Sequence, residues 1–252
     1  MLAAIRQFYM EKVGEETRKK IRQLRFHHLR GPQNLAYRLL FGSNLKALAV
    51  LYGTDKATLH SYLEPYAAHF GPLRKRRLNL LEIGIGGFSD PQLGGESLRM
   101  WRAYFPRSRI YGIDIVDKSW HDEKRIKTFR GSQDDESFLA SVLEQTGPLD
   151  IIIDDGSHIC KHVIKSFEFL FPRLKEPGTY VVEDTQTSYW EEGYGGSSAE
   201  LNRPDTTMGY FKSLADGLNN RERRSHEPTY FDQHMSEISF YHNLIFIKKR
   251  PN

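Results

Sequence analysis

The stretch Asp150-Ile-Ile-Ile-Asp154-Asp155-Gly156-Ser157-His158 decides how the rest of the chain is interpreted. It begins with an apolar run, which is typical of a buried parallel strand, and ends in two carboxylates, a glycine and a histidine. A second apolar run, Thr179-Tyr-Val-Val182, leads in the same way into Glu183-Asp184. Ligands bind at the carboxyl edge of open α/β sheets. The two strand ends therefore predict one cleft that collects carboxylates and an imidazole, as a metal ion and a base would require.

Length and composition limit the class of protein to which such a cleft belongs. The chain has 252 residues, of which 39% are hydrophobic. No apolar run approaches the roughly 18 residues that span a bilayer, so the sequence predicts a soluble α/β domain with extensions. Much of the net charge of +4 lies in residues 1–30 and in Arg74-Lys-Arg-Arg77. So small an excess of positive charge does not predict a nucleic-acid partner.

The N-terminus and the single cysteine suggest a compartment. Arg6, Glu11 and Lys12 interrupt the short apolar start, which is therefore not typical of a signal peptide. Cys160 has no second cysteine for an intrachain disulfide and is interpreted as a buried helical residue. A cytoplasmic location is expected.

Two further strands place candidate ligand-binding groups at the same edge. Leu78–Ile83 ends in Gly84-Ile85-Gly86-Gly87, which leaves room for a ligand beside the backbone, with Glu82 just before the turn. Ser108–Ile113 ends in Asp114, whose carboxylate could accept both hydroxyls of a ribose. This spacing would also suit NAD, but the third glycine of the dinucleotide fingerprint is missing and a long segment, Phe88–Gly95, precedes the next helix.

The remaining pattern alternates strand and helix. The segments expected after Asp114 are a strand at 126–130, a helix at 135–145, a strand at 150–154, a helix at 159–174 and a strand at 179–183. Residues 238–241 and 244–247 then predict an antiparallel hairpin around His242-Asn243. Parallel strands finished by such a hairpin give a mostly parallel seven-stranded sheet, the Rossmann-like class I methyltransferase fold.

The first fifty residues are interpreted as a basic helical extension, and residues 51–252 as the catalytic domain. Residues 2–29 predict one or two amphipathic basic helices, and residues 35–50 a further helix. The arm could bind a membrane surface or a partner. Packing on the domain or on a sister subunit is the preferred interpretation, and a homo-oligomer is expected.

Several of these strings resemble one enzyme family. LLEIGIGG (80–87), YGIDI (111–115), RGSQ (130–133), DIIIDDGSH (150–158), YVVEDTQTSYW (180–190) with YGG (194–196), and the upstream YGTDK (52–56) are similar to the S-adenosylmethionine-dependent sugar O-methyltransferases of macrolide and polyketide glycoside pathways. The likeness covers roughly residues 50–196. It implies methyl transfer to a sugar hydroxyl of a glycosylated small molecule or glycoconjugate.

The resemblance also implies a role for individual residues. Asp155, Glu183 and Asp184 would bind Mg²⁺ or Mn²⁺, because hard carboxylate oxygens favour such ions. His158 would be the general base. Tyr189 and Trp190 would stack on the sugar. The residues implied for S-adenosylmethionine are Thr54, Glu82, Gly84, Gly86, Asp114, Ser132, Gln133 and Asp154.

Simpler interpretations of the same residues stay open at this point. Glu183-Asp184 could cap the next segment, Asp155 could be a turn residue and His158 could cap the helix near Ile159. The aromatic residues around 189–194 could form an ordinary loop. A nucleotide-sugar or NAD enzyme, a methyltransferase for another hydroxyl, and a binding protein without catalysis are the alternative functions.

Overall fold

The computed structural model describes residues 30–57 and 61–251, which build a seven-stranded sheet in the order β3-β2-β1-β4-β5-β7-β6. Strands β1 to β5 pair in parallel, while β7 runs antiparallel to β5 and to β6. The strands are β1 (Asn79–Ile83), β2 (Arg109–Asp114), β3 (Ile126–Arg130), β4 (Ile151–Asp154), β5 (Gly178–Glu183), β6 (Met235–Tyr241) and β7 (Leu244–Lys249). The predicted fold class is confirmed, and β6 begins earlier than expected.

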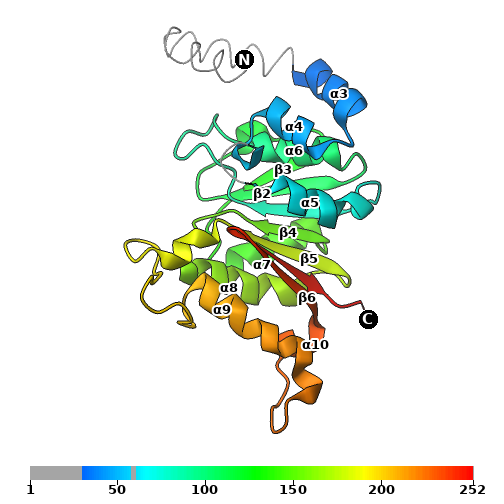
Figure 1. Cartoon of the computed structure of the whole chain (residues 1–252). Helices are drawn as coiled ribbons and strands as arrows, with labels where there is room; N and C mark the ends of the chain where they lie inside the picture. Colours follow the sequence, from blue (N-terminus) through cyan, green and yellow to red (C-terminus); the bar gives the residue numbers. More distant parts are fainter. Residues whose placement is uncertain (1–29, 58–60, 252) are drawn as a thin grey trace.

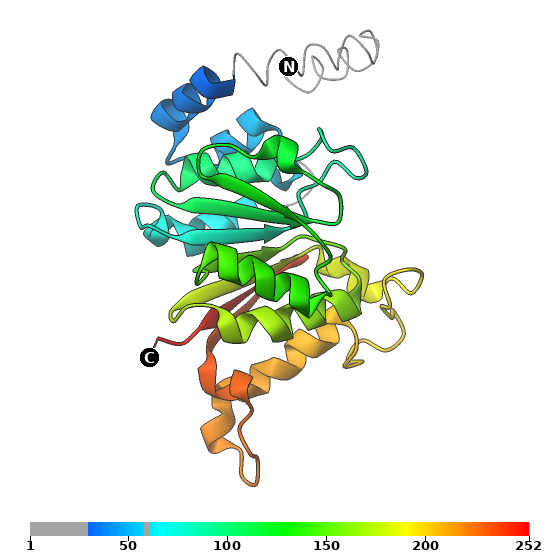
Figure 2. The same ribbon diagram turned by 180° about the vertical axis from the view of Figure 1, so that it is seen from behind.

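Helices cover both faces of this sheet (Figures 1 and 2). The α-helices are α3 (Arg30–Phe41), α4 (Leu45–Tyr52), α5 (Leu63–Phe70), α6 (Glu96–Tyr104), α7 (Glu136–Thr146), α8 (Cys160–Leu170), α9 (Thr207–Leu214) and α10 (Tyr230–His234). The 3₁₀ turns are η2 (Asp55–Ala57), η3 (Gly71–Leu73), η4 (Ser119–His121), η5 (Phe171–Arg173), η6 (Thr185–Tyr189) and η7 (Ala215–Glu222). Helices α4, α5 and α6 pack on one face, and α7, α8 and α9 on the other.

Alternation along the strands decides which residues meet which layer. Leu80 and Ile110 are buried with α4, α5 and α6, whereas their neighbours Leu81 and Tyr111 are buried with α7 and α8. Successive side chains of a strand point to opposite faces, so a strand covered on both sides is apolar at nearly every position. This burial fixes the sheet and, through it, the position of the groups that follow each strand.

Two predicted helices differ from the structure. The helix expected at 35–50 is two helices, because Asn44 caps α4 by accepting a hydrogen bond from the Ala47 N–H at 2.9 Å. The helix expected at 159–174 is regular only to Leu170 and continues as η5, where Pro172 has no N–H to offer the helical ladder.

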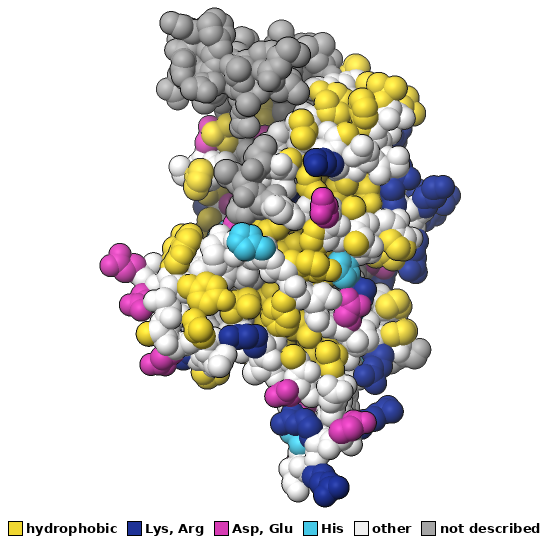
Figure 3. Space-filling model, viewed as in Figure 1, with side chains coloured by type: hydrophobic (Ala, Val, Ile, Leu, Met, Phe, Trp, Pro, Cys, Tyr) yellow, Lys and Arg dark blue, Asp and Glu magenta, His cyan; other side chains and the backbone are white. Residues whose placement is uncertain are grey.

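The N-terminal arm predicted at residues 2–29 lies outside the described residues. The first described helix, α3, exposes Leu35, Leu39 and Leu40, and hydrophobic side chains gather at that end of the molecule in Figure 3. The boundary expected at residue 50 falls inside α4, whose Leu48 and Ala49 are buried in the core. The division of the chain there stays a prediction. No helix in the described ranges is long and apolar enough to cross a membrane.

Candidate active site

The register of the sheet brings the predicted site residues to one edge. Ile83 of β1 pairs with Asp154 of β4, which pairs with Val182 of β5. The residues that follow these positions, Gly84, Asp155 and Glu183, therefore lie side by side at the carboxyl edge of these strands. The backbone N–H of Asp155 donates to the Ile83 carbonyl at 2.9 Å. This edge lies on the left of Figure 1, where the yellow segment after β5 begins.

Asp155, His158 and Asp184 form the candidate metal centre. Each offers one ligand atom, and these three atoms lie within 4.8 Å of one another. His158 Nε2 is 3.6 Å from Asp184 Oδ2. All three residues are partly exposed, so the cluster is open to a ligand from solvent. Two carboxylates beside an imidazole are a donor set that fits a divalent cation.

The backbone at two of these residues is strained. His158 has φ +55° and Asp184 has φ +53°, both in the left-handed region. A non-glycine residue there costs on the order of 1–3 kcal/mol and persists where the surrounding structure enforces it, as at functional sites. Both strained residues place a ligand atom in the same cluster.

Helix capping does not account for these side chains. The N-cap of α8 is Ile159, which makes no side-chain cap hydrogen bond. Asp184 is the N-cap of η6, and it too makes no side-chain cap hydrogen bond. His158 therefore does not occupy the N-cap of α8, and Asp184 occupies that of η6 without a side-chain cap hydrogen bond.

Glu183 lies deeper than its two neighbours and contacts a lysine. Its Oε2 accepts from Lys56 Nζ at 2.7 Å, and its Oε1 accepts from the Tyr66 hydroxyl. The same ammonium lies 2.6 Å from Asp155 Oδ2. Burial raises the pKa of Glu183 well above its ordinary range, with Asp155 adding to the effect and Lys56 opposing it. The role of Glu183 as a metal ligand stays a prediction.

Asp184 is held by a tyrosine from a distant part of the chain. The Tyr62 hydroxyl donates to Asp184 Oδ1 at 2.6 Å and lies 3.0 Å from the Asn243 carbonyl oxygen. Burial and the neighbouring carboxylate raise the pKa of Tyr62, so the phenol keeps its proton and remains a donor. One oxygen of Asp184 is thereby fixed while the other faces His158.

Lys56, Tyr62 and Tyr66 are site residues that the sequence interpretation did not assign. The structure buries all three side chains. Their polar ends donate to carboxylates that lie 99 to 127 residues further along the chain. One signal could have identified them. A hydroxyl or an ammonium that is buried needs a hydrogen-bonding or charged partner, because an unpaired buried polar group is costly.

On the cofactor side, Glu82 and the glycine turn match the expectation for a close-fitting ligand. Glu82 is fully buried and accepts from the Ser97 hydroxyl at 2.8 Å. Its other oxygen lies 3.5 Å from Lys56 Nζ and has no hydrogen-bond partner among the described residues. Gly84 has φ +85°, and a Cβ there would lie 2.0 Å from the Asp155 carbonyl oxygen. Gly86 has φ +75°, so both turn positions suit glycine.

Asp114 stands at the end of β2, as predicted, and is half-buried. One of its oxygens accepts from the Ile85 N–H at 3.0 Å and the other from the Val116 N–H at 2.9 Å. These bonds tie the end of β2 to the glycine turn. Thr54 is buried, and its hydroxyl lies 3.4 Å from a carboxylate oxygen of Asp55.

Asp154 and Gln133 occupy a buried polar network rather than an open surface. Asp154 accepts from the Ser166 hydroxyl at 2.6 Å and from the Gln133 side-chain amide at 3.0 Å. The Gln133 carbonyl oxygen accepts from the Ser157 N–H at 2.7 Å. In this arrangement they brace the turn that carries Asp155. Ser132 donates its hydroxyl to Asp134.

The predicted sugar-stacking residues follow the metal cluster directly. Tyr189 is 39% exposed and Trp190 is 47% exposed. The Trp190 ring packs edge-on against Tyr194, with the ring centroids 5.4 Å apart. Two large aromatic rings are thus presented to solvent shortly after Asp184, and their contact with a sugar stays a prediction.

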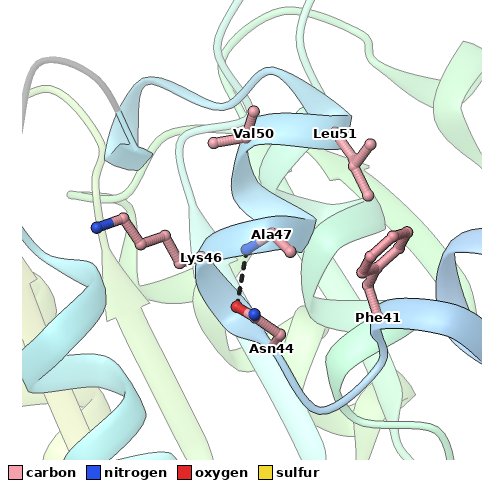
Figure 4. A pocket seen from close by; sticks show the side chains of 6 residues that line it. All are labelled: Phe41, Asn44, Lys46, Ala47, Val50 and Leu51. Carbon is pink, nitrogen blue, oxygen red and sulfur yellow. Dashed lines mark hydrogen bonds between the residues drawn. The ribbon is translucent and has the colours of Figure 1, made fainter.

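A cavity elsewhere has no catalytic groups. It has a volume of about 370 Å³ and lies at α4, where Phe41 and Leu51 point toward one another and Asn44 bonds Ala47 (Figure 4). No carboxylate or histidine lines it. The polar edge of the sheet, rather than this apolar hollow, is therefore the candidate active site.

Comparison with known proteins relates the chain to one group of enzymes. No protein-family model matches the chain. The 8-demethyl-8-alpha-L-rhamnosyl tetracenomycin-C 2'-O-methyltransferase of Streptomyces olivaceus is 45% identical over 213 residues, which are 82% of this chain and 55% of that protein. The mycinamicin VI 2''-O-methyltransferase of Micromonospora griseorubida is 43% identical over 213 residues, which are 83% of this chain and 53% of that protein. Over this region the chain is similar to the sugar O-methyltransferase family of macrolide and polyketide pathways.

A solved member of this O-methyltransferase family has the same fold. The MycE methyltransferase of the mycinamycin biosynthetic pathway, in complex with Mg, SAH and mycinamycin VI, matches with a TM-score of 0.79 and 42% identity over 82% of this chain and 54% of that one. The chain therefore spans about half the length of the relatives that it matches. The resemblance inferred from the short motifs is confirmed.

Proposed function

We propose that this chain transfers a methyl group from S-adenosylmethionine to a sugar hydroxyl of a glycosylated small molecule or glycoconjugate. The observation that carries the proposal is the convergence of Asp155, His158 and Asp184 at the carboxyl edge of a sheet whose family members are sugar O-methyltransferases. The relatives' names concern glycosides of macrolide and tetracenomycin type, which are the acceptors to test first.

Asp155 and Asp184, with Glu183 behind them, would hold a magnesium or manganese ion. The grouping of Asp155 and Asp184 with one ligand atom each supports this assignment. When bound, such an ion lowers the pKa of an aliphatic hydroxyl and orients it, which makes the hydroxyl a better nucleophile. Tyr62 keeps Asp184 in place for that task through its 2.6 Å hydrogen bond.

The cofactor would bind along the ends of β1 and β2. Gly84 and Gly86 leave the backbone open to close approach, since no side chain occupies the turn. Glu82, whose carboxylate lies just before the glycine turn, suits the amino-acid part, and Asp114 suits the ribose. Thr54, Ser132, Gln133 and Asp154 would then act around or behind this pocket.

His158 would accept the proton of the acceptor hydroxyl. The acceptor oxygen forms a bond to the methyl carbon, the carbon–sulfur bond breaks, and the proton goes to the imidazole. Asp184 Oδ2, at 3.6 Å from His158 Nε2, would orient the ring and stabilise its charged form. Tyr189 and Trp190 would hold the apolar face of the sugar, because aromatic rings stack on such faces.

A mass-shift screen tests this function. Labelled S-adenosylmethionine is offered with glycosides, free sugars and nucleotide sugars, and methylation of a glycoside is expected. Calorimetry with S-adenosylmethionine and with NAD separates the methyltransferase from the nicotinamide alternative. Binding of NAD alone, without methyl transfer to any sugar, would contradict the proposal.

We further propose a homo-oligomer in the cytoplasm, with residues 1–50 as its packing arm. The apolar exposure of Leu35, Leu39 and Leu40 on α3 supports a packing role for this end. Light scattering of the full chain and of a variant without residues 1–29 tests it: a lower mass per particle is expected after truncation, and an unchanged oligomer would contradict it.

A further inference from the structure

Lys56 has an unusual position for a lysine. It follows α4 in the turn η2 and is only 1% exposed, although lysine is rarely buried without partners. Its ammonium lies 2.6 Å from Asp155 Oδ2, 2.7 Å from Glu183 Oε2 and 3.5 Å from Glu82 Oε1. One buried cation is thus shared by carboxylates from the ends of β1, β4 and β5.

The ammonium is charged in this setting. Burial alone would lower the pKa of Lys56, but Asp155, Glu183 and Glu82 outweigh it and hold the pKa well above its ordinary value. Burying an unpaired charge is costly, so the lysine and its carboxylates stabilise one another.

Two of the three carboxylates on Lys56 are also predicted ligands of the divalent ion. Asp155 uses Oδ2 on the ammonium, and both oxygens of Glu183 are engaged, one by Lys56 and one by Tyr66. Carboxylate oxygens that already contact an ammonium attract a second cation less strongly. The positive charge of the ammonium also repels a metal ion that approaches them. Asp184, by contrast, is bound by Tyr62, which is neutral.

We propose that Lys56 is a positioning residue that acts as an internal cation in competition with the divalent ion for Asp155 and Glu183. The lysine keeps these carboxylates ordered and charge-balanced without the metal, at the expense of metal affinity. The Glu82 contact extends the same cluster to the cofactor side of the site. This inference rests on the proposed function, because it presupposes the divalent-ion site.

The sign of one measurement separates this role from simple structural support. Magnesium and manganese affinities are measured by calorimetry on the full chain, without an acceptor, for the wild type and for Lys56→Met, which keeps the length of the side chain and removes its charge. Competition predicts that the variant binds the ion more tightly, by about tenfold or more, since one positive charge near the ion is gone. Structural support predicts weaker binding because the carboxylates lose their anchor.

Lys56→Arg is the matched control, because it retains the charge, and it is expected to show no gain in ion affinity. If Lys56→Met fails to fold, Glu183→Gln is compared with Lys56→Met/Glu183→Gln, in which the buried charges are more nearly balanced. Asp155 remains a partner of Lys56 in that background, so the double variant should still bind the ion more tightly than Glu183→Gln. Circular dichroism and urea unfolding establish that the compared variants are folded.

Unchanged or weaker ion binding in the folded lysine-free proteins would overturn the inference and leave the methyltransferase proposal intact. Absence of ion binding in all variants would overturn both the inference and the metal site. Methyl transfer from labelled S-adenosylmethionine by the wild type is scored separately, so failure of the proposed activity is distinguished from failure of the competition.

Discussion

His158 is the residue at which a protein base and a metal ligand can be distinguished. A positioned base contributes about 10²–10⁴ in rate. His158→Ala should therefore lower kcat by that factor at saturating magnesium, while the magnesium Kd measured by calorimetry changes little. His234→Ala is the control, because its ring stacks on Tyr230 of α10 and belongs to no part of the proposed site. A large loss of magnesium affinity in His158→Ala would make the imidazole a ligand instead.

Glu82 should make stability depend on pH. Burial raises its pKa to about 7 from the ordinary 4.5, with Lys56 opposing part of the rise. Between these two values the folded protein holds a proton that the unfolded chain has released, so stability falls as pH rises through this window. The total is about 3 kcal/mol for a shift of this size.

Glu82→Gln isolates this contribution, because Asp155 and Glu183 also have raised pKa values and act in the same direction in both proteins. The unfolding free energy of the variant minus that of the wild type, measured with urea, should rise by up to about 3 kcal/mol from pH 4.5 to pH 7.5. A difference between the two proteins that stays constant across this range would contradict the prediction.

At the scale of elements, Gly84 in the turn after β1 can be compared with Gly193, a second glycine with a similar positive φ. Gly84 and Gly193 have φ +85° and +79°, but a Cβ would meet the Asp155 carbonyl oxygen at Gly84 and nothing within 4 Å at Gly193. Gly193→Ala should cost only about 1–2 kcal/mol of left-handed strain. Gly84→Ala must also displace Asp155, so we expect a larger loss in urea unfolding together with weaker binding of S-adenosylhomocysteine in calorimetry. Equal losses in both variants would contradict this account.

The elements also show what the sequence could and could not predict. β1, β4 and β5 each contain an apolar run and are buried at nearly every position, and each run leads into a glycine or a carboxylate, so their place and the edge they share could be predicted. The break between α3 and α4 depends on one cap, Asn44, inside a helical pattern. The partners Lys56–Glu183 and Tyr62–Asp184 join segments far apart in sequence, and no local period reports such a pairing. Helices α9 and α10 were not predicted, although Thr206 and Thr229 cap them.

For the whole molecule, negative charge is concentrated at the carboxyl edge of the sheet, and a bound cation would reduce the repulsion there. Glu82, Asp155 and Glu183 lie around a single buried lysine, and Asp184 follows Glu183 directly. Like charges at one site disfavour the folded state, and a cation that binds only the folded protein stabilises it. The metal site should therefore be visible in stability as well as in catalysis.

Removal of metal should abolish turnover and lower the melting temperature, whereas S-adenosylhomocysteine binding should survive, because Gly84, Gly86 and Asp114 lie at other strand ends than Asp184. Added magnesium or manganese should restore activity. At an ion concentration of about a hundred times Kd the gain in unfolding free energy is about 2.7 kcal/mol, which calorimetric melting with and without EDTA can measure.

Asp184→Asn, which keeps the shape of the side chain, should need more magnesium for the same melting temperature and the same activity. Full activity and an unshifted melting temperature after exhaustive dialysis against EDTA would show that the carboxylate cluster acts without a metal ion.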